Sequence, residues 1–199
     1  MRTAGAMLAA LCLTAPAAQA DEIIAQIDQA KRYYDEGDYA GAIVEFEFTI
    51  NTLRSKLAEL FAATLPEPLP RWRADDAEIN AGASMFGGGT TVNRNYVSRD
   101  GKGTLRAQLI VDSPVVQAVS AMLNNPVVMA GQSDLERIRI DHDNAMLDWS
   151  EEDHRGEISL ALGTRVMAKI DGSDLEDKMV LVEMMKAWDI DAVRSVAGR

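Results

Sequence analysis

The sequence EISLALGTRVMAKI, residues 157–170, decides how the second half of the chain folds. Apolar side chains occupy every second position on both sides of Gly163-Thr164, and polar side chains fill most positions between them. A period of two is typical of a strand that buries one face, and a short turn between two such runs indicates an antiparallel hairpin. The alternation recurs at residues 105–111 and 137–140, and less regularly at 72–78, 92–98 and 145–149. We therefore expect a one-sided antiparallel sheet.

Two helical segments accompany these strands. The first follows Ser113-Pro114, a capping residue before a proline at the first helical position, and it stops at Asn124-Asn125-Pro126. The second is predicted to begin at a capping box, in which Ser173 bonds the amide of Glu176 and the Glu176 side chain reaches back. Apolar residues then recur at helical spacing, at Leu175, Met179, Val182 and Met185. Residues 71–199 are thus expected to form an α+β domain with the sheet packed under two helices.

A helical hairpin is expected before this domain, over residues 21–64. A helical pattern runs from Glu22 to about Glu36, Gly37-Asp38 interrupts it, and a second helix follows. The short connection predicts that the two helices are antiparallel. The second helix carries a long apolar stripe of residues three and four apart: Tyr39, Ala42, Ile43, Phe46, Ile50, Leu53, Leu57, Leu60 and Phe61.

This stripe is the candidate interaction surface of the protein. It presents more apolar surface than the shorter first helix can cover, and large exposed apolar patches are rare on monomers. We predict that the stripe packs on the first helix, and that its end from Leu57 to Phe61 packs on the α+β domain or on a second chain. The residues assigned to the candidate surface are Tyr39, Phe46, Leu57, Leu60 and Phe61.

Two further segments complete the organisation. Residues 1–20 have the pattern of a cleavable signal peptide, with Arg2, an apolar run from Ala4 to Leu13, and Ala18-Gln19-Ala20 before the acidic Asp21. That run is too short to span a bilayer, and no later segment is long and apolar enough to do so. Residues 65–70, Leu-Pro-Glu-Pro-Leu-Pro, predict a stiff extended spacer, with a polyproline ligand as the alternative. The sequence therefore predicts export to the periplasm.

The run from Gly37 to Phe46, with Ala30 and Tyr33 before it, resembles the segment between the two helices of a tetratricopeptide repeat. The match covers about one repeat, and no second copy follows at a period of 34 residues. In outline the predicted domain resembles the PsbP-like class of antiparallel sheets flanked by helices. The whole layout is similar to a group of secreted bacterial proteins with a helical hairpin, a Leu-Pro-x-Pro-Leu-Pro-x-Trp junction and a Gly-rich loop. These resemblances imply the fold and export, and they transfer no catalytic residue.

The charge and the cysteine content exclude several classes of function. The net charge is −11 at pH 7, which repels phosphate backbones and anionic lipid headgroups, so binding to nucleic acid or directly to a membrane surface is disfavoured. The single cysteine, Cys12, lies in the predicted signal peptide. The mature chain is therefore expected to have no disulfide, no thiolate metal site and no cysteine nucleophile.

The two histidines are weak candidates for a metal site. His142 and His154 each neighbour carboxylates that a divalent cation accepts as ligands. A strand over residues 145–149 would place the two clusters at its opposite ends, too far apart to share one ion. We expect structural turns at both positions.

Met179, Met184 and Met185 and the Gly-rich loop are two further candidates. The three thioethers would suit Cu(I), but Met179 falls on the apolar stripe of the last helix, where methionine commonly fills space. Residues 82–89 form a Gly-rich loop without the spacing of a phosphate-binding motif. Met85 and Phe86 in this loop are candidate contact residues.

These observations predict a non-enzymatic periplasmic module for protein interaction or scaffolding. Its partner would be an unidentified protein or a second copy of the chain, and we expect no catalytic residue, no cofactor and no metal. The alternative is a periplasmic accessory protein that binds a small ligand or a metal. In that case the loop over residues 82–91 would close over a concave apolar pocket on one face of the sheet.

Overall fold

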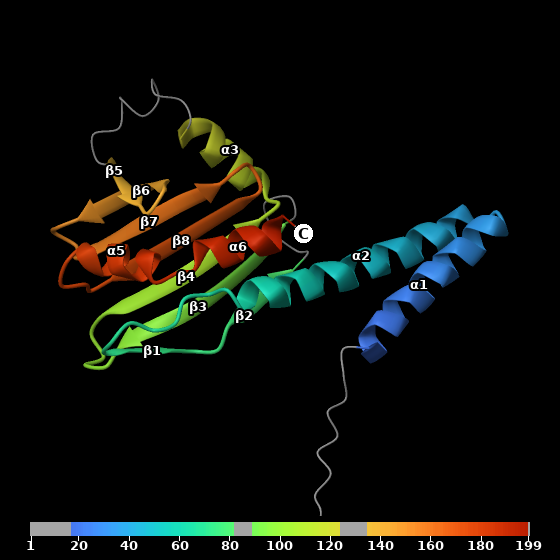
Figure 1. Cartoon of the computed structure of the whole chain (residues 1–199), viewed down its shortest axis with the longest axis horizontal. Helices are drawn as coiled ribbons and strands as arrows, with labels where there is room; N and C mark the ends of the chain where they lie inside the picture. Colours follow the sequence, from blue (N-terminus) through green and yellow to red (C-terminus); the bar gives the residue numbers. More distant parts are fainter. Residues whose placement is uncertain (1–16, 82–88, 124–134, 199) are drawn as a thin grey trace, which may run out of the picture. The chain divides into compact units, whose positions relative to one another are not determined.

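The computed structural model describes residues 17–81, 89–123 and 135–198. The fold is α+β, as predicted, with two helices followed by an antiparallel sheet and further helices packed on it (Figure 1). The chain divides into two compact units, Met1–Leu53 and Arg54–Arg199, and their boundary falls inside the second helix. No helix in the described ranges has both the length and the apolar character needed to cross a membrane.

The first unit is an antiparallel helical hairpin made of α1 (Ala17–Asp35) and the first part of α2 (Tyr39–Ala62). Gly37 ends α1 with φ of +80°, a left-handed conformation that glycine adopts without strain. The Asp38 side chain then caps α2, because its Oδ1 accepts from the amide of Gly41 at 3.0 Å. A Cβ on Gly41 would lie 2.6 Å from Asp38 Oδ2 and 3.2 Å from a ring carbon of Tyr33, so this turn requires glycine there.

The second unit contains an eight-stranded sheet in which the strands that pair are all antiparallel. The strands are β1 (Trp72–Ala74), β2 (Glu78–Ala81), β3 (Thr90–Ser98), β4 (Thr104–Val111), β5 (Leu135–Ile140), β6 (Asp143–Ser150), β7 (Arg155–Leu162) and β8 (Val166–Ser173). Their order is β1-β3-β4-β8-β7-β6-β5, and β2 also pairs with β3. The strand expected over residues 72–78 is therefore two short strands, and the other predicted strands are confirmed.

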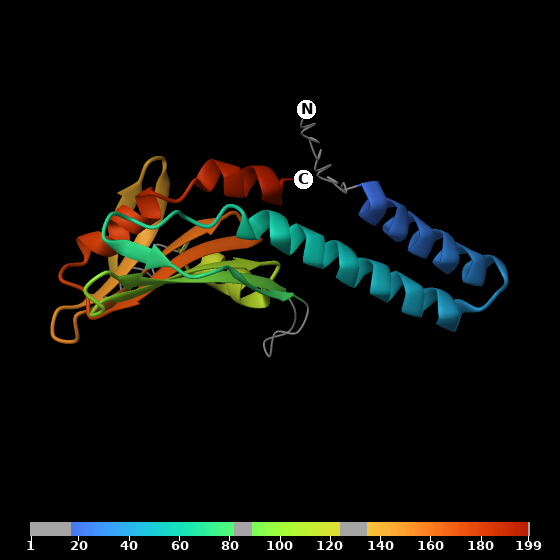
Figure 2. The same ribbon diagram turned by 90° about the horizontal axis from the view of Figure 1, so that it is seen from below.

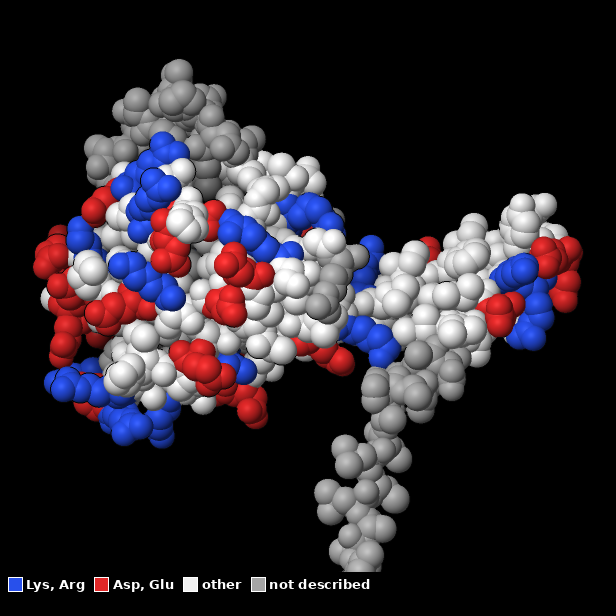
Figure 3. Space-filling view, viewed as in Figure 1, with Lys and Arg blue, Asp and Glu red and all other residues white. Residues whose placement is uncertain are grey.

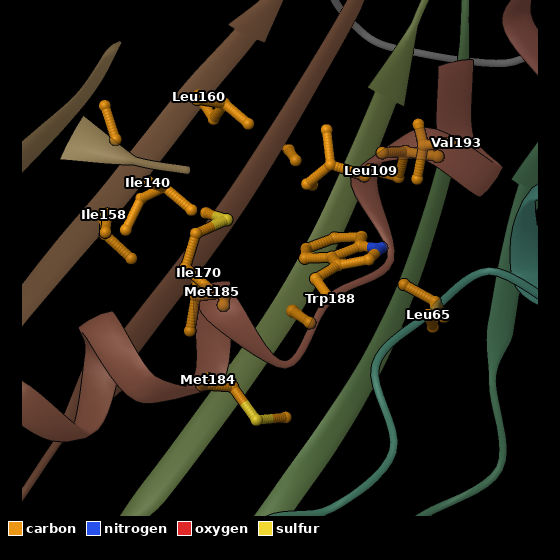
Figure 4. Packing of buried hydrophobic residues seen from close by; sticks show 14 of the residues in the cluster. Leu65, Leu109, Ile140, Ile158, Leu160, Ile170, Met184, Met185, Trp188 and Val193 are labelled. Atoms are coloured by element: carbon orange, nitrogen blue, oxygen red, sulfur yellow. The ribbon is translucent and has the colours of Figure 1, made fainter. Parts of the chain in front are cut away.

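Helices pack on both faces of this sheet. Figure 2 shows α5 (Met179–Lys186) and α6 (Ile190–Ala197) on one face and α3 (Pro114–Leu123) on the other. The core lies under α5 and α6, where the alternate positions that the sequence marked as apolar are buried. Figure 4 shows Met185 and Trp188 directed at this face of the sheet, beside Ile170 and Leu109. The predicted burial of one face is confirmed for β4 and β7. Strands β6 and β8 instead bury consecutive residues, 145–147 and 166–168, so both of their faces are buried there.

Two paired glycines allow α5 to approach the sheet closely. Gly156 on β7 lies opposite Gly172 on β8 in the ladder. A Cβ on Gly156 would overlap the backbone oxygen of Asp148 and come within 3.2 Å of Leu181 on α5. A Cβ on Gly172 would come within 2.8 Å of Leu175. The glycines thus leave the space that these two leucines fill.

The proline-rich segment before the sheet is anchored rather than free. Leu65 and Pro66 are buried, and the Tyr96 hydroxyl on β3 donates to the carbonyl oxygen of Pro66 at 2.6 Å. Burial raises the pKa of Tyr96 to about 12, because the phenolate would lose its hydration. The segment therefore packs on the sheet instead of serving as a detached spacer.

The start of the last helical segment differs from the prediction. Strand β8 extends through Ser173, whose hydroxyl is 2.9 Å from that of Thr104 on the neighbouring strand β4. Helix α5 begins only at Met179, whose amide donates to Asp177 Oδ1 at 2.8 Å. The predicted capping box at Ser173 is therefore wrong, because pairing with β4 holds this residue in the sheet. Met179, which we expected in the core, is 46% exposed.

Candidate functional site: an apolar face on the helical hairpin

Exposed apolar side chains are concentrated on the two N-terminal helices. Of the thirteen large apolar side chains that are exposed in the described residues, eleven lie on α1 and α2. On the face seen in Figure 3, charged side chains gather at the tip of the hairpin and leave an uncharged surface behind it. Soluble monomers seldom present so much contiguous apolar surface, so this surface is the strongest candidate for function.

The composition of α2 explains this exposure. Between Tyr39 and Leu53 the sequence has two charged residues, Glu45 and Glu47, and the remaining positions are apolar, small or uncharged polar. A helix that is apolar on most of its circumference is normally buried on most of its circumference. One neighbouring helix covers only one side.

Helix α1 packs against the side of α2 that carries small residues. Within residues 22–53, Ala30 on α1 and Ala42 and Thr49 on α2 are buried. Thr49 satisfies its hydroxyl inside the contact by donating to the Glu45 carbonyl oxygen at 2.8 Å. Small side chains let two helix axes approach closely, so this side is the natural contact with α1.

The predicted stripe lies beside this contact. Its residues Tyr39, Ile43, Phe46, Ile50 and Leu53 are between 43% and 63% exposed. The prediction that the stripe packs on the first helix is therefore wrong for most of these positions, although Tyr39 contacts Tyr34 of α1 while remaining exposed. The small side chains of Ala42 and Thr49 turn α2 so that its larger apolar residues stay at the surface.

The far end of the stripe behaves as expected. Phe61 is fully buried in the core of the α+β unit, Leu57 packs against that core, and Leu60 remains exposed. The prediction that this end packs on the α+β domain is confirmed. Among the five residues assigned to the candidate surface, Tyr39, Phe46 and Leu60 are exposed, whereas Phe61 does not belong to the surface.

A contact between two aromatic rings joins the exposed residues of the two helices. The rings of Tyr34 on α1 and Tyr39 on α2 are 5.7 Å apart between centroids and tilted by 60°. Ile27 and Tyr34, seven residues apart, lie on the same side of α1 and are both exposed. The exposed residues of α1 thus continue the exposed stripe of α2. We use the name hairpin face for Ile27, Tyr34, Tyr39, Ile43, Phe46, Ile50 and Leu53.

The histidines occupy exposed turns, as the sequence suggested. His142 lies in the turn before β6 and His154 in the turn after it, where it has φ of +50°. The strand therefore separates them, and the described residues contain no group of three or more His, Cys, Asp or Glu side chains placed to hold a metal. Asp143, next to His142, pairs instead with Arg194 of α6 at 2.5 Å.

The remaining sequence candidates do not form one site. Met184 and Met185 are fully buried, whereas Met179 is turned toward solvent, so the three sulfur atoms do not share a surface. Met85 and Phe86 lie outside the described residues. A pocket beneath residues 82–91 also falls largely outside them.

The face of the sheet opposite α5 and α6 has a hollow of about 680 Å³ whose lining is partly charged and partly apolar. Lys169 lies within this face and pairs with Glu157 at 2.6 Å and with Asp171 at 3.8 Å. Burial raises the pKa of Asp171 above its usual value, although Lys169 and Arg106 act in the opposite direction. The hollow is lined by Asn95, Arg106, Asp148, Arg155, Glu157 and Asp171, among others. Its walls carry charges of both signs alongside apolar side chains such as Val97 and Leu105.

Comparisons with protein-family models, with curated proteins and with solved structures returned no match to this chain. The candidate site thus stands on its own geometry. In the sequence, the apolar stripe of α2 indicated this site. The sequence did not show that the small residues Ala42 and Thr49 would face α1 and leave the stripe exposed.

Proposed function

We propose that the protein is a non-enzymatic periplasmic module that binds another protein chain through the hairpin face. The observation that carries the proposal is the exposure of the seven apolar side chains of this face, between 41% and 63% each. Apolar surface of this extent gains free energy when a partner removes it from water. The periplasmic location is supported by the signal-peptide pattern of residues 1–20.

A role without catalysis is supported by the positions of the reactive side chains. The two histidines lie in exposed turns at opposite ends of β6. Two carboxylates of the sheet hollow, those of Glu157 and Asp171, pair with Lys169 on the same face of the sheet. A carboxylate that forms an ion pair with a neighbouring cation is accounted for by that structural role, so it is not by itself evidence of a catalytic site.

The proposal is tested by cross-linking in the cells that make the protein. A photo-reactive amino acid in place of Ile43, inside the hairpin face, is expected to give covalent adducts with a protein chain. The same amino acid in place of Ser195, an exposed residue of α6, is the control and should give none above background. Equal adduct formation at the two positions, or none at position 43, would contradict the proposal.

A second function is favoured by the hollow on the sheet, whose lining includes charges of both signs. Its charged walls suit a small polar or zwitterionic ligand, and its volume of about 680 Å³ lies in the range of small-molecule sites. The protein would then be a ligand-binding accessory protein. Thermal-shift screening against amino acids, short peptides and divalent cations tests this alternative, since a ligand at 100 times its Kd should add about 2.7 kcal/mol of stability. If no compound in the panel raises the melting temperature, the ligand-binding alternative is excluded for these compounds.

A further inference from the structure

The apolar residues of α2 within the hairpin follow a strict heptad spacing. Steps of four and three residues alternate from Tyr39 through Ile43, Phe46 and Ile50 to Leu53. Such a 4-3 alternation keeps one seam of a helix facing a partner helix in a left-handed coiled coil. Helix α1 leaves most of this seam exposed, because it packs on the neighbouring side at Ala42 and Thr49 and touches the seam at Tyr39. The hairpin therefore contains a helix-pairing seam whose partner is not α1.

We propose that the hairpin face binds a second copy of this chain, so that two hairpins pair across a twofold axis into a four-helix bundle. This inference rests on the proposed function, and it identifies the partner. A heptad seam is complementary to another heptad seam, and a twofold axis brings the same surface of two copies together. Every copy of the chain supplies such a seam.

The residues that flank the seam favour self-pairing over a different partner. Coiled coils select a different partner mainly through charged residues at the two positions beside the seam. Here those positions are Ala40, Ala42, Glu47, Thr49 and Arg54, with one charge of each sign among the five. The net charge of −11 opposes self-association elsewhere on the chain, whereas the hairpin face itself has no charged residue. The contact itself would therefore place no like charges together, although the hairpin around it is acidic.

The size of the hairpin face fits a stable dimer. Seven side chains, each about half exposed, present roughly 600 Å² per copy if a large apolar side chain has about 180 Å² of surface. Two copies would then bury about 1,200 Å² through these side chains alone, which reaches the lower end of specific interfaces. The ring contact between Tyr34 and Tyr39 makes the face continuous across both helices.

The test measures the mass of the full chain in solution over a range of concentrations, by sedimentation equilibrium. Unchanged protein is expected to be a dimer. Ile43→Glu should raise the dimer Kd by about 100-fold or more, because each dimer would bury two unpaired carboxylates. Val44→Glu is the matched control: Val44 is 63% exposed and Ile43 58%, yet Val44 lies off the seam, so its variant should remain a dimer. Ile50→Ala, a milder change inside the seam, should weaken the dimer while helical circular dichroism stays unchanged.

The outcomes separate this inference from the proposed function. A monomer at all concentrations up to about 100 µM would overturn the second copy as partner, since that Kd is far weaker than a specific interface supplies. Adducts at position 43 with a different protein would then still support a docking module. A dimer that Val44→Glu disrupts while Ile43→Glu does not would overturn the seam as the interface.

Discussion

Replacing Tyr96 with phenylalanine tests whether the proline-rich segment is anchored to the sheet. The Tyr96 hydroxyl is fully buried and donates to the Pro66 carbonyl oxygen at 2.6 Å. Tyr96→Phe removes this bond, leaves the carbonyl oxygen of the buried Pro66 without its donor, and keeps the ring. Leaving a buried acceptor unpaired costs about 1–3 kcal/mol. For a chain of this size, 2 kcal/mol lowers the melting temperature by about 4–8 °C.

The same hydroxyl makes stability depend on alkaline pH. The pKa of Tyr96 is raised from 10.0 to about 12 in the folded protein by burial. Between these values the unfolded chain loses the proton first, so the folded state is destabilised as the pH rises. Two pKa units correspond to about 3 kcal/mol, all of it lost by pH 12. The advantage of the unchanged protein over Tyr96→Phe should therefore shrink as the pH rises above 10.

Urea unfolding at pH 7.5, 10 and 11 measures both effects. Tyr34→Phe is the control, because Tyr34 is exposed on the hairpin and its substitution should change the free energy of unfolding by less than about 0.5 kcal/mol. A Tyr96→Phe protein as stable as the unchanged protein at pH 7.5, or a difference that stays constant with pH, would refute the anchoring of this segment.

Two further predictions concern packing under α5, and urea unfolding measures both. Gly156→Ala should lower the free energy of unfolding by about 1–3 kcal/mol, because its Cβ would overlap the rigid backbone oxygen of Asp148 and lie 2.9 Å from the Trp149 ring. Unchanged stability would contradict this, because it would require β7 to move away from both groups without cost. Met184→Ala should cost about 2–5 kcal/mol because the side chain is fully buried. Met179→Ala, at a half-exposed position on the same helix, should cost less than about 0.5 kcal/mol, and equal losses would contradict the assigned exposure.

Much of the sheet could be predicted from the sequence because strands such as β4 and β7 bury only one face. At residues 105–111 the positions expected to be buried are buried, and the same holds on both sides of Gly163-Thr164. Alternation of this kind is a direct record of which side faces the core. The strand order could not be predicted in the same way, since β4 pairs with β8 across a long stretch of intervening chain.

The predicted start of the last helix was wrong for a related reason. A capping box is a local pattern, whereas the place of Ser173 is set by Thr104 in a distant strand. The backbone hydrogen bonds that join β8 to β4 stabilise this residue in the sheet by more than a single side-chain cap would stabilise it at the start of a helix. Local signals therefore failed where a partner far along the sequence decided the conformation.

The sequence predicted the apolar stripe of the candidate site, but not which side of α2 contacts α1. The spacing of the stripe from Tyr39 onward was evident, and so was its excess of apolar surface. The side of α2 that contacts α1 depends on volume rather than on hydrophobicity, because Ala42 and Thr49 allow a closer approach than Phe46 would. Periodicity reports which residues are apolar, and it does not rank two apolar sides of one helix by their fit to a neighbour.

The order of strands in the sheet also governs how the protein reaches its folded state. Strands β1 to β4 form one run of sequence neighbours and β5 to β8 another, and the β4–β8 pair alone joins the two runs. The strands within each run can pair early through short turns. Pairing β4 with β8 is slower, because it brings together segments far apart in the chain and so costs more loop-closure entropy. Leu181, Met184, Trp188 and Val193, which cover both runs, are translated after every strand. A nascent chain therefore cannot complete its core until the residues of α5 and α6 have been synthesised.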